Sequence, residues 1–173
     1  MSALLRQTSR RIRALLPILS SIALVIFGLL PIGLPHFSSV APSFALMAVF
    51  YWSIFRSDLM TMLGAFLIGL LLDLLSGGPL GLNALMLVVV HELGVSQRRV
   101  FLGSSFLVNW AAFALLVGAV VPLSWGLISL LHWRLLPTAP ALAQVILALT
   151  LYPAVYWLLS RLERRWLRGS LAV

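Results

Sequence analysis

The chain has 173 residues, of which 62% are hydrophobic and only 9% are charged, and its mean hydropathy is +1.10. Soluble domains contain about 45–50% apolar residues, so this composition excludes an ordinary soluble domain and predicts an integral membrane protein. The absence of Cys excludes disulfide bonds and cysteine-based metal sites. A helix that spans a bilayer needs about 20 apolar residues, so the chain has room for about six such helices joined by short loops.

The net charge of +8 reflects twelve Arg residues and no Lys. In a soluble protein, a pI near 11.7 would suggest a nucleic-acid partner. These arginines instead lie at the ends of apolar runs, where basic residues set membrane topology and attract anionic lipid. We therefore expect anionic lipid as a partner, and we do not expect nucleic acid.

The apolar stretches predict an all-α fold. In chain order, the expected membrane helices cover about 14–34, 40–56, 59–75, 80–95, 100–131 and 141–160. The first break holds Pro31, Gly33, Pro35 and Pro42, and the third is the run Ser76-Gly77-Gly78-Pro79. The fifth stretch is too long for one straight span, so Pro122 and Gly126 are expected to kink or end it.

The distribution of arginines supports the count of six. With six crossings, eleven arginines fall on one side and only Arg134 on the other, which is a strong positive-inside signal. We therefore expect a polytopic membrane protein with both termini in the cytoplasm: a basic N-terminus at 1–13, a transmembrane domain at 14–160 and a basic tail at 161–173. The arginines that carry this topology signal at the termini and in one loop are Arg10, Arg11, Arg13, Arg98, Arg99, Arg161, Arg164, Arg165 and Arg168.

Asp73 is the acidic residue most in need of an explanation, because it lies near the outer end of an apolar helix and just before a new helix begins. A carboxylate there can accept hydrogen bonds from the free amides of the next helix and meet its positive dipole end. Asn83, in the first turn of that helix, can join the same network. A structural lock for the hairpin, a proton or ligand site, and a polar contact to a partner helix all remain open.

Other residues in the same region are packing or partner-contact candidates. Gly69 shares a helix face with Asp73 and permits close helix approach. Glu92, beside His91, can extend to the membrane interface and pair there with Arg98 or Arg99. Enzyme signatures are absent from the sequence, so no catalytic residue, cofactor or metal site is expected.

The run from Gly69 to Ala84, GLLLDLLSGGPLGLNA, resembles the rod shape-determining protein MreD family. The family pattern is a Gly, an Asp four residues later, a turn of small residues such as Gly77 and Pro79, and a Leu-Gly pair ending in Gly81 that opens the next helix. Upstream residues, Pro42-Ser43-Phe44 and Tyr51-Trp52, also fit the family's second helix. The match covers about 40–100, and the rest agrees in length, helix count and basic termini.

The resemblance implies a non-enzymatic role in cell shape. MreD-like proteins work in the bacterial inner membrane with the single-span protein MreC, the actin-like MreB and the elongation synthases that insert peptidoglycan along the side wall. The architecture is also similar, more distantly, to the substrate-binding membrane subunits of vitamin importers. That similarity provides the alternative function, a subunit that binds a small solute in a pocket open to the outside.

Overall fold

The computed structural model describes residues 2–29, 43–133 and 137–166, and all regular secondary structure in these ranges is helical. The helices are α1 (Ser2–Leu29), α2 (Phe44–Phe55), α3 (Met62–Ser76), α4 (Leu82–Ser96), α5 (Arg98–Phe101), α6 (Phe106–Leu131) and α7 (Ala139–Trp166). The predicted all-α fold is confirmed. The predicted break at Pro31–Pro42 and the lone outer residue Arg134 lie outside the described residues.

Two helices have the length and hydropathy to cross a membrane by themselves, Phe106–Leu131 and Ala139–Arg165. Four shorter apolar helical stretches accompany them, Leu15–Leu29, Phe44–Phe55, Met62–Ser76 and Leu82–Ser96. These helices fit a helical membrane protein. Six crossings with both termini inside stay a prediction.

Three details differ from the sequence-based expectation. Helix α6 continues through Pro122 and Gly126 to Leu131, so neither residue ends this stretch, and the alternative that they kink it stays a prediction. The basic loop after α4 contains the single-turn helix α5. The basic residues after Ser160 extend α7 as far as Trp166.

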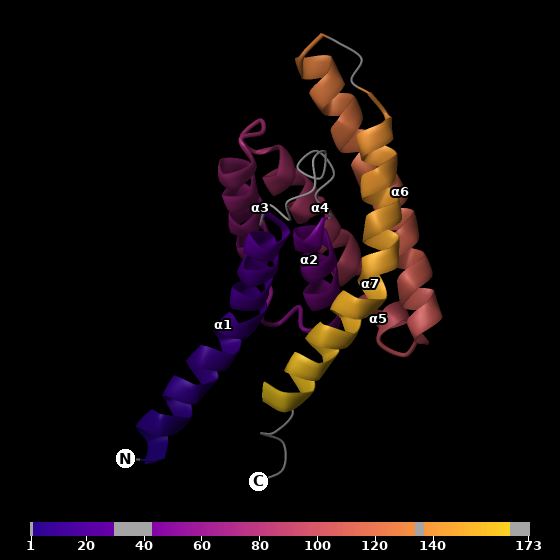
Figure 1. Cartoon of the computed structure of the whole chain (residues 1–173). Helices are drawn as coiled ribbons and strands as arrows, with labels where there is room; N and C mark the ends of the chain where they lie inside the picture. The colour runs from indigo at the N-terminus through magenta and orange to yellow at the C-terminus, as the bar shows by residue number, and fades with distance from the viewer. Residues whose placement is uncertain (1, 30–42, 134–136, 167–173) are drawn as a thin grey trace.

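Helix α2 lies at the centre of the molecule (Figure 1). Every residue from Ala45 to Ile54 is buried, including the large side chains of Tyr51 and Trp52. It packs against α1, α3, α4, α5 and α7. A helix that is apolar on all sides has no polar face to present to solvent, and here protein covers all of its sides.

The α6–α7 hairpin joins this centre through aromatic side chains. Phe113 of α6 stacks on Tyr152 of α7 with ring centroids 4.0 Å apart, and Phe50 of α2 lies 5.7 Å from Phe113. The N-terminus of α1 and the C-terminus of α7 lie at the same end of the molecule, and the hairpin extends beyond the shorter helices at the other end (Figure 1).

Candidate functional site

The α3–α4 hairpin turns through two glycines with left-handed backbone conformations. Helix α3 ends at Gly77, which has φ +68° and donates its N–H to the Asp73 carbonyl at 3.2 Å. Gly81, with φ +93°, precedes the first residue of α4. A side chain at either position would strain the backbone, so these two glycines allow α3 and α4 to lie antiparallel with a short connection.

The Asp73 carboxylate lies across the start of α4. Its Oδ2 accepts hydrogen bonds from the backbone N–H groups of Gly81 at 2.8 Å and Ala84 at 3.3 Å. Its Oδ1 accepts from the backbone N–H of Asn83 at 3.1 Å and from the Asn83 side-chain amide at 2.8 Å. Gly81 has no side chain to cap the helix, so a residue eight positions earlier satisfies amides that would otherwise lack acceptors.

Gly69 brings the two helices of the hairpin into direct backbone contact. A Cβ atom at this position would lie 2.4 Å from the Cα of Ala84 and 2.6 Å from its backbone nitrogen. Gly69 is one helical turn before Asp73, so the same face of α3 provides the close approach and the capping carboxylate. The short separation lets the short Asp side chain reach the amides of α4.

This arrangement acts as a helix cap. Asp73 is 1% exposed, and all four of its side-chain contacts are donated by N–H groups. An ionised carboxylate offers only acceptors, which matches these donors and the positive end of the α4 dipole. No group of three His, Cys, Asp or Glu side chains that could hold a metal ion occurs in the part of the chain that the structure describes.

Glu92 is exposed on α4 and does not take part in the Asp73 network. The expected ion pair from Glu92 to Arg98 or Arg99 is absent among the described residues, where Arg56–Asp58 is the one salt bridge. Arg98 instead donates to the hydroxyl of Ser57 at 2.7 Å, because α5 turns its side chain back toward the α2–α3 connection. The described residues therefore do not form the ion pair that Glu92 could make.

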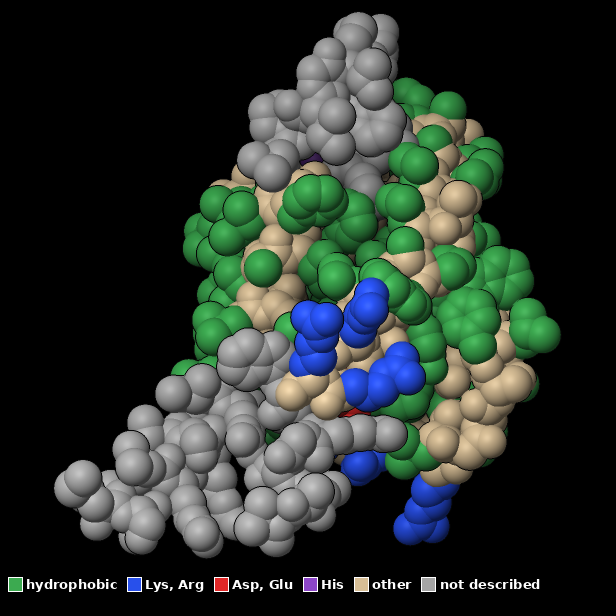
Figure 2. Space-filling view, turned by 60° about the horizontal axis from the view of Figure 1, so that its bottom comes forward, with side chains coloured by type: hydrophobic (Ala, Val, Ile, Leu, Met, Phe, Trp, Pro, Cys, Tyr) green, Lys and Arg blue, Asp and Glu red, His purple; other side chains and the backbone are tan. Residues whose placement is uncertain are grey.

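The remaining site candidates lie at the two ends of the molecule. Pro79 lies in the α3–α4 connection beside Gly81 and is partly buried. The α5 and α7 arginines gather at the end that holds the α7 C-terminus, where Figure 2 shows the basic side chains together. The side chains of Arg10, Arg11 and Arg13, and the whole of Arg168, lie outside the described residues.

A second polar contact inside the bundle was missed. His91 is 5% exposed and lies within α4, and its Nδ1 is 2.8 Å from the Ser53 hydroxyl of α2. Gly94 permits this approach, since a Cβ there would lie 2.9 Å from the Cβ of Ser53. The sequence did contain an indication of this contact, because Gly94 lies about one turn from His91 in an apolar helix. This spacing does not identify the helix that His91 faces.

The comparisons with known proteins point to one family. The family model described as rod shape-determining protein MreD matches residues 9–162. No curated protein and no solved structure matches the chain. Because the family match spans both hairpins and most of the 173 residues, this chain belongs to the MreD family of rod shape-determining proteins.

Proposed function

We propose that this protein is a non-enzymatic membrane component of the machinery that elongates the side wall and supports peptidoglycan synthesis there. The observation that carries the proposal is the family match over residues 9–162, which assigns the chain a role in rod-shape determination. Its direct partner in this proposal is an MreC-like single-span membrane protein. MreB and the elongation synthases are reached indirectly through that partner.

The exposed apolar faces of the bundle support binding by helix packing. On α3, Leu63 and Leu67 are 64% and 53% exposed, and on α6, Leu107 and Leu115 are 70% and 79% exposed. Lipid can cover these faces, and a partner helix can replace lipid without burying any further polar group. A chain whose described residues are nearly all in helices offers chiefly such faces to a partner in the membrane.

The importer alternative needs a ligand pocket at the end opposite the arginines. The pocket there has a volume of about 160 Å³ and lies between the ends of α1, α2, α3, α4 and α7. Small-molecule sites usually occupy about 300–1,000 Å³. Its polar lining residues include Ser43, Asn83 and Gln144, with Gln144 donating to Ser43 at 2.6 Å. Ser43 and Gln144 are bonded to each other, and the Asn83 amide donates to Asp73, which favours the scaffold function over solute binding.

The proposed orientation places the protein in the bacterial inner membrane with segments 1–13 and 161–173 in the cytoplasm. Its support is the gathering of arginines at one end of the bundle, as the positive-inside rule requires of the cytoplasmic side. Cysteines introduced singly at Ser39, Ser76 and Thr138 should react with an impermeant thiol reagent added from outside. A cysteine at Ser170 should react only after the membrane is permeabilised, and labelling of intact cells at Ser170 would contradict this orientation.

Co-purification tests the function. The tagged chain, extracted in mild detergent, should retain an MreC-like protein that an equally expressed, unrelated helical membrane protein does not retain. Two double alanine variants distinguish the two candidate faces: one replaces Leu63 and Leu67 on α3, and the other replaces Leu107 and Leu115 on α6. Only one of these double variants should lose the partner. Saturable binding of a vitamin-like solute, with no MreC-like protein retained, would support the importer function instead.

A further inference from the structure

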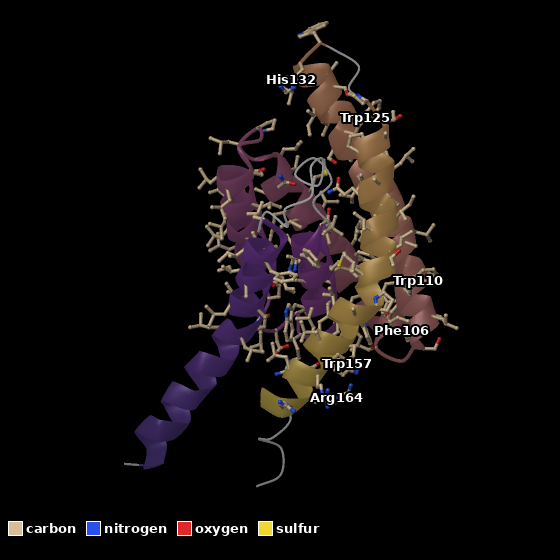
Figure 3. The ribbon with its side chains drawn as sticks, in the orientation of Figure 1. Phe106, Trp110, Trp125, His132, Trp157 and Arg164 are labelled. Carbon is tan, nitrogen blue, oxygen red and sulfur yellow. The ribbon has the colours of Figure 1, made fainter. Side chains whose placement is uncertain are left out.

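A polar pocket of about 580 Å³ lies at the arginine-rich end of the bundle. It is formed where the end of α2, the α2–α3 connection, α5 and the last turns of α7 meet, so its wall comes from segments far apart in the chain. Three of its lining residues are Arg56, Arg98 and Arg164. Figure 3 shows Arg164 at this end of α7, and Figure 2 shows basic side chains gathered there with an acidic side chain between them.

Two of these guanidinium groups have unused donors inside the protein. The Nε atoms of Arg56 and Arg98 are buried and have no hydrogen-bond partner among the described residues. Asp58 approaches Arg56 Nε at 3.5 Å without a hydrogen bond, and Arg98 uses only Nη1, toward Ser57. Because neither Nε has an acceptor inside the protein, the positive charge of these two guanidinium groups is only partly paired there, and an anion with several acceptor oxygens in the pocket that they line would be stabilised by this charge.

The acidic residues in the pocket wall do not neutralise the charge of its arginines. Glu163 accepts a hydrogen bond from the Tyr51 hydroxyl at 2.9 Å, and Asp58 is 55% exposed. Three arginines against two carboxylates leave the wall with a net positive charge. Phe55, Leu102 and Tyr156 provide an apolar side to the same pocket, which is the combination expected around a headgroup at a membrane interface.

We infer that this pocket binds a phosphate group, carried either by an anionic lipid headgroup or by a free phosphate ester. Guanidinium groups converging from three segments suit the tetrahedral, multiply accepting oxygens of phosphate. The site would link α2, α5 and α7 through one ligand. This inference is independent of partner binding and of the proposed function.

Native mass spectrometry of the purified full-length chain in detergent, titrated with phosphatidylglycerol, tests the inference through matched pairs of variants. Arg98→Gln removes a pocket arginine, and Arg99→Gln removes its exposed neighbour outside the pocket. Arg164→Gln and Arg161→Gln form a second pair on α7, where Arg161 lies over the Trp157 ring at 4.7 Å. We expect the pocket variants to bind phosphatidylglycerol about tenfold more weakly, because each loses charge-assisted hydrogen bonds, and the outside variants to bind as wild type.

Two further measurements keep the result interpretable. Ser57→Ala removes the contact to Arg98 but keeps its charge, so this variant should still bind phosphatidylglycerol. If Arg98→Gln does not fold, the comparison of Arg164→Gln with Arg161→Gln tests the inference instead. Arg164 is exposed, so its replacement should leave the fold intact. Equal weakening within each pair, or equal binding of diacylglycerol with the same chains, would overturn the inference. Competition by glycerol 3-phosphate would assign the site to phosphate esters generally, and pocket-dependent binding without such competition would assign it to lipid.

Discussion

Replacing Asp73 tests whether the capping network holds the α3–α4 hairpin together. Asp73→Ala removes the acceptor for four donated hydrogen bonds. Water can reach some of these donors, since Gly81 and Asn83 are only partly buried, but Ala84 is 0% exposed. Leaving the Ala84 N–H unpaired should cost about 1–3 kcal/mol, and the other contacts about 1 kcal/mol more, so we expect a loss of about 2–4 kcal/mol in the free energy of unfolding.

Asp73→Asn should destabilise the protein less than Asp73→Ala, because the new side-chain amide can still make most of these hydrogen bonds. Its oxygen can keep the contacts to the Gly81 and Ala84 N–H groups, while its NH₂ donates to the Asn83 side chain after that amide flips. One donor, the Asn83 N–H, then faces an NH₂ group, and we expect a loss of about 1–2 kcal/mol. Asp73→Leu loses every contact and adds branched bulk beside the close helix approach, so the order of damage is Asn, then Ala, then Leu.

The assay heats each variant in detergent and measures the fraction that stays monodisperse by size-exclusion chromatography, alongside co-purification of the MreC-like partner. Glu92→Ala is the control, because Glu92 is exposed and outside the Asp73 network, and surface changes usually stay within about 0.5 kcal/mol. An unchanged melting midpoint for Asp73→Ala would refute the capping argument. Full-level, partner-bound Asp73→Asn protein in cells that nevertheless lose their rod shape would indicate proton or ligand chemistry instead.

Two further substitutions test packing and a long-range contact in the same melting assay. Gly69→Ala should lower the melting midpoint by the equivalent of about 1–3 kcal/mol, because the new Cβ meets the Ala84 backbone, which cannot move aside. Gly118→Ala is the control and should be neutral or slightly stabilising, because nothing lies within 4 Å of a Cβ at that position. Equal effects of the two substitutions would contradict the close approach at Gly69. Tyr51→Phe removes the hydroxyl that Glu163 accepts from and should cost about 1 kcal/mol; an unchanged midpoint would show that this contact does not anchor α7 to α2.

The features that the sequence by itself determined are local in the chain. The α3–α4 turn follows from Gly77 and Pro79, and the contact between Asp73 and Asn83 spans only ten residues. Two helices joined by so short a connection have to lie side by side, so a carboxylate at the end of one is near the start of the other. Composition in turn determined the membrane environment, because a chain with 62% hydrophobic residues cannot be covered by water-facing polar groups.

The tertiary structure alone decided which helix is central and which distant polar groups meet. In a membrane protein, lipid-facing and protein-facing residues are equally apolar, so hydropathy does not distinguish the buried α2 from the exposed faces of α3 and α6. Ser53 and His91 are 38 residues apart, and Tyr51 and Glu163 are 112 apart. Such pairs form only because helix packing brings small residues and aromatic rings into register, and no periodicity within one helix identifies the helix that it will face.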